Sequence, residues 1–143
     1  MISVLVPIEE GRDPAWAIRH AIELYRSEPV RIYLLNVRTP LPSYVARFIP
    51  PAERQAFHHE NGMRAMRQAI ERLDEAGIAH RDHVLVGDKA ETIMDFAREH
   101  HCAQIIIDKP AGGLFEGLGL GSIREQLHHL VQPGDSFQIR EGT

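Results

Sequence analysis

The glycine-rich segment at residues 109–122 has the composition best suited to bind a ligand. Backbone N–H groups can approach phosphate oxygens closely at glycine because it has no Cβ, and the N-terminus of a following helix favours negative charge. The segment therefore indicates a phosphate-binding loop, with a flexible loop that binds nothing as the open alternative. The residues that suit such a phosphate site are Gly112, Gly113, Gly117, Gly119, Gly121 and Ser122.

Two carboxylates are predicted to lie beside this loop, at the ends of strands. Glu9 follows the first apolar run of the chain, and Asp108 follows the fourth. In an open parallel sheet, ligands bind beyond the carboxyl ends of the strands, so both side chains belong to the candidate site. Glu9 and Asp108 are the candidate Mg²⁺ ligands, because carboxylate oxygens suit that ion. Without a cation, the same two charges oppose the binding of phosphate.

The histidines and the single cysteine do not indicate a metal centre or a catalytic nucleophile. Adjacent residues on a helix point about 100° apart, so neighbouring histidines rarely bind one metal ion. We therefore expect the histidine pairs to lie on solvated faces, and Cys102 to be a small buried hydrophobic residue. The histidine pairs and Cys102 are therefore assigned no catalytic role and no metal site. The histidine pairs are His58-His59, His100-His101 and His128-His129.

The elements that position these residues begin with a strand and a helix. The apolar run at residues 2–6 predicts a buried strand. Asp13 can then cap a helix that has Pro14 at its first position. Residues 30–37 are rich in β-branched and aliphatic side chains, which predicts a second strand.

The rest of the chain repeats this alternation. Apolar residues recur at helical spacing over residues 52–76, which predicts one long helix. Residues 80–86 predict a third strand, residues 90–101 a further helix, and residues 103–107 a fourth strand that is almost wholly apolar. A weak final strand is expected at residues 136–140.

A last helix is predicted between the fourth and fifth strands. Ser122 and Glu125 have the spacing of a capping box, which marks its start. Five strands alternating with four helices predict an α/β fold, a three-layer sandwich with an open five-stranded parallel sheet. The length of 143 residues suits one compact unit, so we expect residues 1–143 to form a single domain.

The composition excludes several classes of protein. A hydrophobic fraction of 43% is too high for a disordered chain. No apolar run approaches the roughly 20 residues that span a bilayer. The net charge of −4 gives no general attraction to nucleic acid or to an anionic membrane. Cys102 cannot form an intramolecular disulfide, and the first residues do not resemble a signal peptide, so we expect a cytoplasmic location.

The arginines on and near the long predicted helix alternate with carboxylates. Such alternation predicts a solvated surface of mixed charge and argues against a face that binds nucleic acid. The arginines concerned are Arg47, Arg54, Arg64, Arg67 and Arg72.

The order of the elements and four motifs resemble the universal stress protein family. The motifs are Val4-Leu5-Val6-Pro7, Leu34-Leu35-Asn36-Val37, Val86-Gly87 followed by Glu91, and Leu118-Gly119-Leu120-Gly121-Ser122-Ile123. The resemblance implies a sheet of the adenine-nucleotide hydrolase-like or flavodoxin-like type and a homodimer formed through the last strand. It also implies an adenine nucleotide, with its base and ribose near Pro7, Ile8, Glu9 and Val37 and its phosphates near Gly121, Ser122 and Ile123.

The sequence departs from the family's ATP-binding pattern, which is Gly-x-x-Gly, nine residues, and then Gly-Ser or Gly-Thr. Gly121-Ser122 matches the end of the pattern, but Asp108 and Ala111 stand at the two earlier glycine positions. Glu9 stands where the family has an aspartate thought to read the adenine. Because Asp108 adds a charge that repels phosphate, we expect weak or absent ATP binding.

The resemblance thus implies a small cytoplasmic stress-response protein that acts by binding and regulation, with an unidentified protein partner. Two alternatives stay open. The first is a genuine ATP-binding universal stress protein that uses Gly121-Ser122. The second is a Mg²⁺-dependent enzyme of the same fold that hydrolyses nucleotides, with Glu9 and Asp108 holding the metal.

Overall fold

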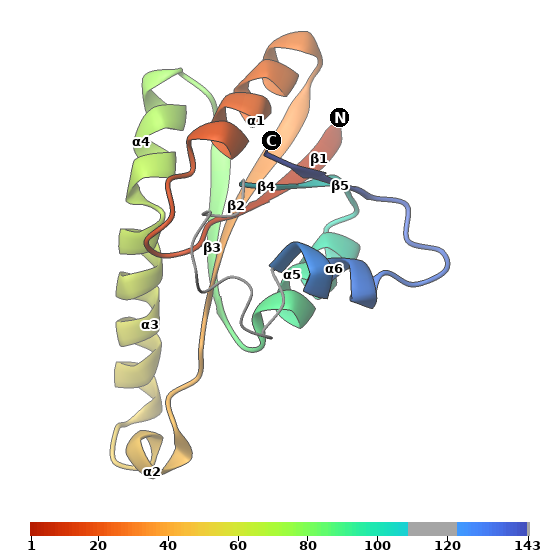
Figure 1. Cartoon of the computed structure of the whole chain (residues 1–143). Coiled ribbons are helices and arrows are strands. Elements are labelled where there is room, and N and C mark those ends of the chain that lie inside the picture. Colours follow the sequence, from red (N-terminus) through yellow and green to blue (C-terminus); the bar gives the residue numbers. More distant parts are fainter. Residues whose placement is uncertain (109–122, 143) are drawn as a thin grey trace, which may run out of the picture.

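The computed structural model describes residues 1–108 and 123–142 and contains one parallel sheet (Figure 1). The five strands lie in the order β3-β2-β1-β4-β5, and every neighbouring pair is parallel. The open five-stranded parallel sheet predicted from the sequence is confirmed. The strands are β1 (Ile2–Pro7), β2 (Val30–Arg38), β3 (His80–Val86), β4 (Cys102–Ile107) and β5 (Gln138–Glu141).

Helices cover both faces of the sheet, which confirms the three layers. Helices α1, α3 and α4 lie on one face, and α5 and α6 lie on the other (Figure 1). None of the described helices is both long and apolar enough to cross a membrane. The helices are α1 (Ala15–Ser27), α2 (Ser43–Ala46), α3 (Pro51–Ala65), α4 (Arg67–Glu75), α5 (Lys89–Glu99) and α6 (Ile123–Leu130).

The alternation of side chains along the strands divides the core into two parts. On β2, Ile32 and Leu34 pack with α1 and α4, whereas Tyr33 and Leu35 pack with α5. Successive residues of a strand point to opposite faces, so a central strand covered on both faces needs a continuous apolar run. This is the reason that the sequence of β2 could be recognised as a buried strand.

The single helix predicted at residues 52–76 is wrong, because α3 and α4 are separated at Met66. The Met66 backbone has φ −91° and ψ 0°, and its side chain is fully buried. Helix α3 packs on β3, where a Cβ on Gly62 would overlap the side chain of Val84, whereas α4 packs on α1. Helices α3 and α4 therefore pack against different elements. With the short α2, which was not expected, the described residues contain six helices instead of four.

Two helix starts were predicted from capping residues. The N-cap residue of α1 is Pro14, so the prediction of Asp13 at that position is wrong. Asp13 lies one residue earlier, and its carboxylate accepts a hydrogen bond from the backbone N–H of Ala15 at 3.0 Å. The first helical residue is Ala15 instead of Pro14. The other cap, Ser122, lies outside the described residues.

Candidate functional site

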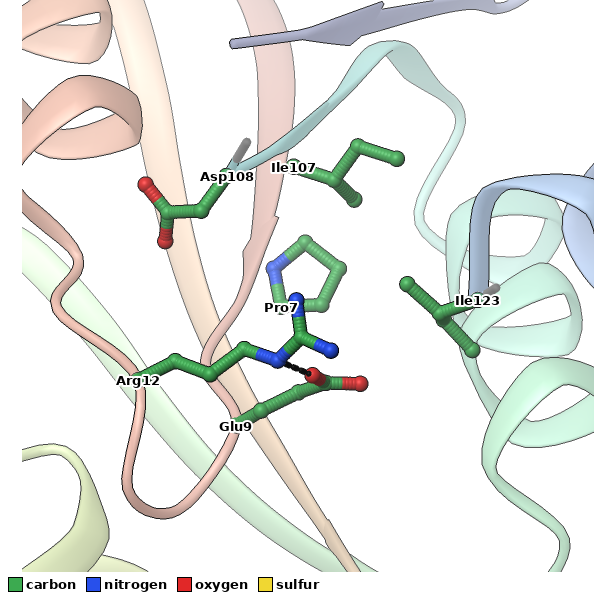
Figure 2. Close-up of a pocket in the computed structure, with 6 residues that line it drawn as sticks. All are labelled: Pro7, Glu9, Arg12, Ile107, Asp108 and Ile123. Atoms are coloured by element: carbon green, nitrogen blue, oxygen red, sulfur yellow. Dashed lines mark ion pairs between the residues drawn. The ribbon is translucent and has the colours of Figure 1, made fainter. Parts of the chain in front are cut away.

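A small pocket lies at the carboxyl ends of β1 and β4, in the middle of the sheet (Figure 2). Because the strand order is β3-β2-β1-β4-β5, the winding direction reverses between β1 and β4, and ligands of open α/β sheets bind at such a point. The enclosed volume of about 20 Å³ holds no more than one water molecule, so a larger ligand has to lie over these residues. Its lining residues are Pro7, Glu9, Arg12, Ile107, Asp108 and Ile123.

The predicted site residues Pro7, Glu9, Asp108 and Ile123 are thus brought together from three distant parts of the chain. The parallel arrangement of β1 and β4 places the first three at one edge of the sheet, and the first turn of α6 supplies Ile123. The predicted phosphate residues Gly112, Gly113, Gly121 and Ser122 lie outside the described residues, as does Ala111.

Glu9 is held by two cations. Its Oε2 lies 2.6 Å from Nε of Arg12, and its Oε1 lies 3.3 Å from Nζ of Lys89, at the start of α5. The Glu9 side chain is 17% exposed, so these ion pairs are partly shielded from water. Sequence reasoning missed both cations. The spacing Glu9-x-x-Arg12 was an available signal for the first, but nothing local in the sequence could indicate Lys89.

Asp108 is directed toward α1. Its Oδ1 accepts a hydrogen bond at 3.0 Å from the backbone N–H of Ala17, in the first turn of that helix. Figure 2 shows the carboxylate pointing away from Ile123. Burial raises the pKa of Asp108, and the nearby charges of Asp13 and Glu9 raise it further, against the opposing hydrogen bond from Ala17. The carboxylate therefore satisfies one of the free N–H groups at the start of α1.

The two candidate magnesium ligands consequently have different roles in this structure. Glu9 is neutralised by Arg12 and Lys89, and Asp108 binds the backbone of α1. Within residues 1–108 and 123–142, no group of three or more histidine, cysteine, aspartate or glutamate side chains is placed to hold a metal ion. The carboxylates can accept hydrogen bonds from a ligand, but they do not form a ready cation site.

Two other predicted residues lie beside this pocket without lining it. The side chain of Ile8 is 3% exposed and belongs to the core, so Ile8 can meet a ligand only through its backbone. The Ile8 carbonyl already accepts a hydrogen bond from Nδ2 of Asn36 at 2.8 Å. Val37 lines a neighbouring cleft with Phe57 and Lys89, and Glu9 lines both this cleft and the pocket.

The sequence predicted the exposure of only some of the histidines correctly. The prediction of a solvated face is wrong for His58, which is 8% exposed, because α3 turns this residue toward the sheet. His100 is half-buried, and its ring stacks on Phe96 with a centroid separation of 3.8 Å. Cys102 is buried as predicted, and burial raises the pKa of its thiol to about 11, so it stays protonated at neutral pH.

Comparisons with known proteins agree on one family. A model of the universal stress protein family matches residues 1–132. A search of curated protein sequences finds no significant match. Among solved structures, universal stress protein UspA from Lactobacillus plantarum is 16% identical with a TM-score of 0.72, over 98% of this chain and 96% of that one.

Two further solved structures carry nucleotides. The universal stress protein from Archaeoglobus fulgidus in complex with dAMP is 17% identical with a TM-score of 0.64, over 99% of this chain and 97% of that one. A universal stress protein family protein from Arabidopsis thaliana with AMP bound is 14% identical with a TM-score of 0.62, over 100% and 93%. At these identities the structures establish the fold alone. Because the family model covers residues 1–132, the chain belongs to the universal stress protein family.

Proposed function

We propose that this protein is a regulatory binding protein of the stress response that binds adenine nucleotides weakly, over the pocket between β1 and β4. Support for an adenine nucleotide comes from the relatives that hold dAMP and AMP. Support for weak binding comes from the charges at the pocket. We also propose that the protein acts in the cytoplasm and through a protein partner, without a catalytic step of its own.

The balance of charge around Glu9 is the observation on which weak binding rests. Two carboxylates, Glu9 and Asp108, face two cations, Arg12 and Lys89, and both cations lie against Glu9. No excess positive charge is left among these four groups for a phosphate. An incoming phosphate would compete with Glu9 for Arg12, and separating a partly buried ion pair costs free energy.

Glu9 can still recognise the base. Each carboxylate oxygen accepts more than one hydrogen bond, so the amino group of adenine can donate to Glu9 while the ion pairs persist. Glu9, Val37 and Lys89 line one cleft, and this cleft is where we place the planar base. This arrangement favours recognition of the base over recognition of the phosphates.

Calorimetric titration with AMP and with ATP, with and without Mg²⁺, tests the proposal. We expect dissociation constants of roughly 0.1–1 mM, close values for AMP and ATP, and little effect of Mg²⁺. Nanomolar binding of ATP would show that the charges at Glu9 and Asp108 do not weaken the site. A complete absence of heat and of thermal stabilisation at saturating nucleotide would leave only the role in binding a partner.

Ser122→Ala separates the phosphate contact from the base contact. If Ser122 binds a phosphate, the variant should lose affinity for both nucleotides but not for adenosine. Unchanged affinity for ATP would remove Ser122 from the site.

We further propose a homodimer formed through β5. This strand pairs with β4 and lies at the edge of the described sheet, so its other side can accept a strand from a second copy. Analytical ultracentrifugation over a range of concentrations should reveal the dimer. A monomer at all concentrations would exclude it.

A further inference from the structure

An open cleft beside the loop from β1 to α1 collects arginines from separate parts of the chain. Figure 1 shows this loop reaching the junction of α3 and α4, on the face of the sheet opposite to α5 and α6. The cleft has a volume of about 560 Å³ and adjoins the pocket between β1 and β4, with which it shares Arg12. Its charged lining residues are Glu10, Arg12, Asp13, Arg64, Arg67 and Arg72.

The cleft is positively charged in a negatively charged protein. Its four arginines and two carboxylates give the lining a formal charge of +2, whereas the whole chain has −4. Arg12 and Arg64 pair with Glu9 and Glu60, which do not line the cleft. The alternating charges of the sequence predicted a mixed surface, and within that surface Arg64, Arg67 and Arg72 come together at this cleft. Arg64 and Arg67 also line a cleft with Glu71, and Arg72 also lines one with Glu75.

The guanidinium groups from α3 and α4 are only lightly engaged. Arg72 lies 3.5 Å from Asp13, and the two side chains are 42% and 71% exposed, so this pair contributes little. Arg64 pairs at 3.2 Å with Glu60, which does not line the cleft. Among the described residues, Arg67 has no carboxylate within ion-pair distance. The N–H groups of Arg64, Arg67 and Arg72 can therefore donate hydrogen bonds to a ligand.

We infer that this cleft binds an oligophosphate group, either a linear inorganic chain or the phosphates of a multiply phosphorylated small molecule. The planar fork of guanidinium N–H groups matches phosphate oxygens, and several arginines around one cleft match several phosphates better than one. Among the residues that the structure describes, no aromatic side chain lines the cleft, so these residues offer nothing on which a base could stack. This inference does not depend on the proposed nucleotide site.

Tripolyphosphate is the probe for the first experiment, with its affinity measured by calorimetry at low salt. The test variant is Arg67→Gln with Arg72→Gln. The matched control is Arg31→Gln with Arg81→Gln, which removes the same charge from two exposed positions on β2 and β3 that line none of these clefts. We expect the test variant to lose at least about tenfold in affinity and the control to lose less than about twofold. Circular dichroism confirms that both variants are folded.

Amide chemical shifts then locate the ligand. Tripolyphosphate should shift the amide signals of Gly11 and Gln68, which line the cleft, and leave that of Ile107 in place. Restoring the charge with Arg67→Lys and Arg72→Lys should recover only part of the affinity, because lysine lacks the fork. A comparison with inositol hexakisphosphate distinguishes the two classes of ligand. Tighter binding of tripolyphosphate favours a linear inorganic chain, and tighter binding of inositol hexakisphosphate favours a multiply phosphorylated small molecule.

Four results would overturn the inference. They are equal losses in the test and control variants, shifts confined to Ile107 and Ile123, orthophosphate binding as tightly as tripolyphosphate, and binding of an aspartate-rich peptide without binding of tripolyphosphate. The first would indicate general charge attraction, and the last a carboxylate-bearing protein partner. The titration with AMP and ATP is a separate experiment, so a failure to bind nucleotide would not affect the result with tripolyphosphate.

Discussion

Asp108 Oδ1 accepts a hydrogen bond from the backbone N–H of Ala17 at 3.0 Å, across 91 residues of sequence. The contact ties the end of β4 to the first turn of α1. The carboxylate therefore acts in two opposite ways. It stabilises the start of a helix, and it places negative charge beside the surface on which a nucleotide is proposed to lie.

Asp108→Asn should strengthen nucleotide binding at little cost in stability. The amide keeps an acceptor for the Ala17 N–H but removes the charge, so we expect the affinity for ATP to rise about three- to tenfold. Calorimetry with ATP measures the change. Asp95→Asn is the control, because Asp95 is 68% exposed and lies on α5 away from the pocket. Equal or weaker binding by Asp108→Asn would show that Asp108 does not repel the ligand.

Asp108→Gly should separate the two roles of the residue. Glycine removes the charge, but it leaves the Ala17 N–H without its acceptor. We expect tighter ATP binding together with a loss of about 1 kcal/mol in the free energy of unfolding. Urea denaturation of the wild type, Asp108→Asn and Asp108→Gly measures that loss. Full stability of the glycine variant would contradict the proposed role in holding α1.

The sequence predicted the framework better than the contacts of the site. Apolar runs such as residues 2–6 and 103–107 identify buried strands, and the parallel order then places Glu9 and Asp108 at one edge. The pairing of Glu9 with Lys89 and of Asp108 with Ala17 joins residues 80 or more positions apart. Local patterns do not contain such information, because it depends on how the helices pack.

The same reasoning explains the missed features of α3. The alternating charges and histidines there looked like a solvated face, yet His58 is buried against the sheet and several arginines converge on one cleft. Which side of the helix faces the sheet is set by Gly62, where the absence of a side chain permits close contact with Val84. A lone glycine within a helical pattern gives no indication of its partner.

Gly62→Ala should destabilise the protein by about 1–3 kcal/mol. A Cβ at this position would overlap both methyl groups of Val84, which sits on a strand and cannot move away freely. Chemical denaturation of Gly62→Ala, compared with Gln55→Ala on the exposed face of α3, measures the difference. The control should change the free energy of unfolding by less than about 0.5 kcal/mol. If Gly62→Ala leaves the free energy of unfolding unchanged or raises it, α3 does not pack closely on β3.

Arg98 connects α5 to the segment between α6 and β5. Its Nε and Nη2 donate to the two carboxylate oxygens of Asp135 at 3.0 Å each, and Nη2 also donates to the carbonyl of Leu130 at 2.7 Å. Asp135→Asn should lower the melting temperature and speed hydrogen exchange in β5. The hydrogen bond from Arg98 lowers the pKa of Asp135, so its contribution is present near neutral pH and is lost as pH falls through that lowered value. An unchanged exchange rate in β5 would contradict this role.

His80 should make the protein less stable as the pH rises above neutrality. Its Nε2 lies 2.7 Å from Asp74 at the end of α4, and its Nδ1 lies 2.6 Å from Asp82 on β3. Burial disfavours the imidazolium, but the hydrogen bonds to Asp74 and Asp82 outweigh burial and raise the pKa of His80 above 6.5. A folded-state pKa above the unfolded value gives stability that is fully present below 6.5 and lost as the pH rises through the raised value.

The variant His80→Gln isolates this effect. It keeps a polar side chain but cannot become charged, so the difference in free energy of unfolding between wild type and variant should be about 1 kcal/mol at pH 6 and should shrink toward pH 9. The comparison with the variant is needed because His83 titrates with the opposite sign, since burial and the nearby His100 lower its pKa. Urea denaturation at several pH values provides the measurement. A difference that is constant with pH would show that His80 is neutral in the folded protein and that its contacts with Asp74 and Asp82 are ordinary hydrogen bonds.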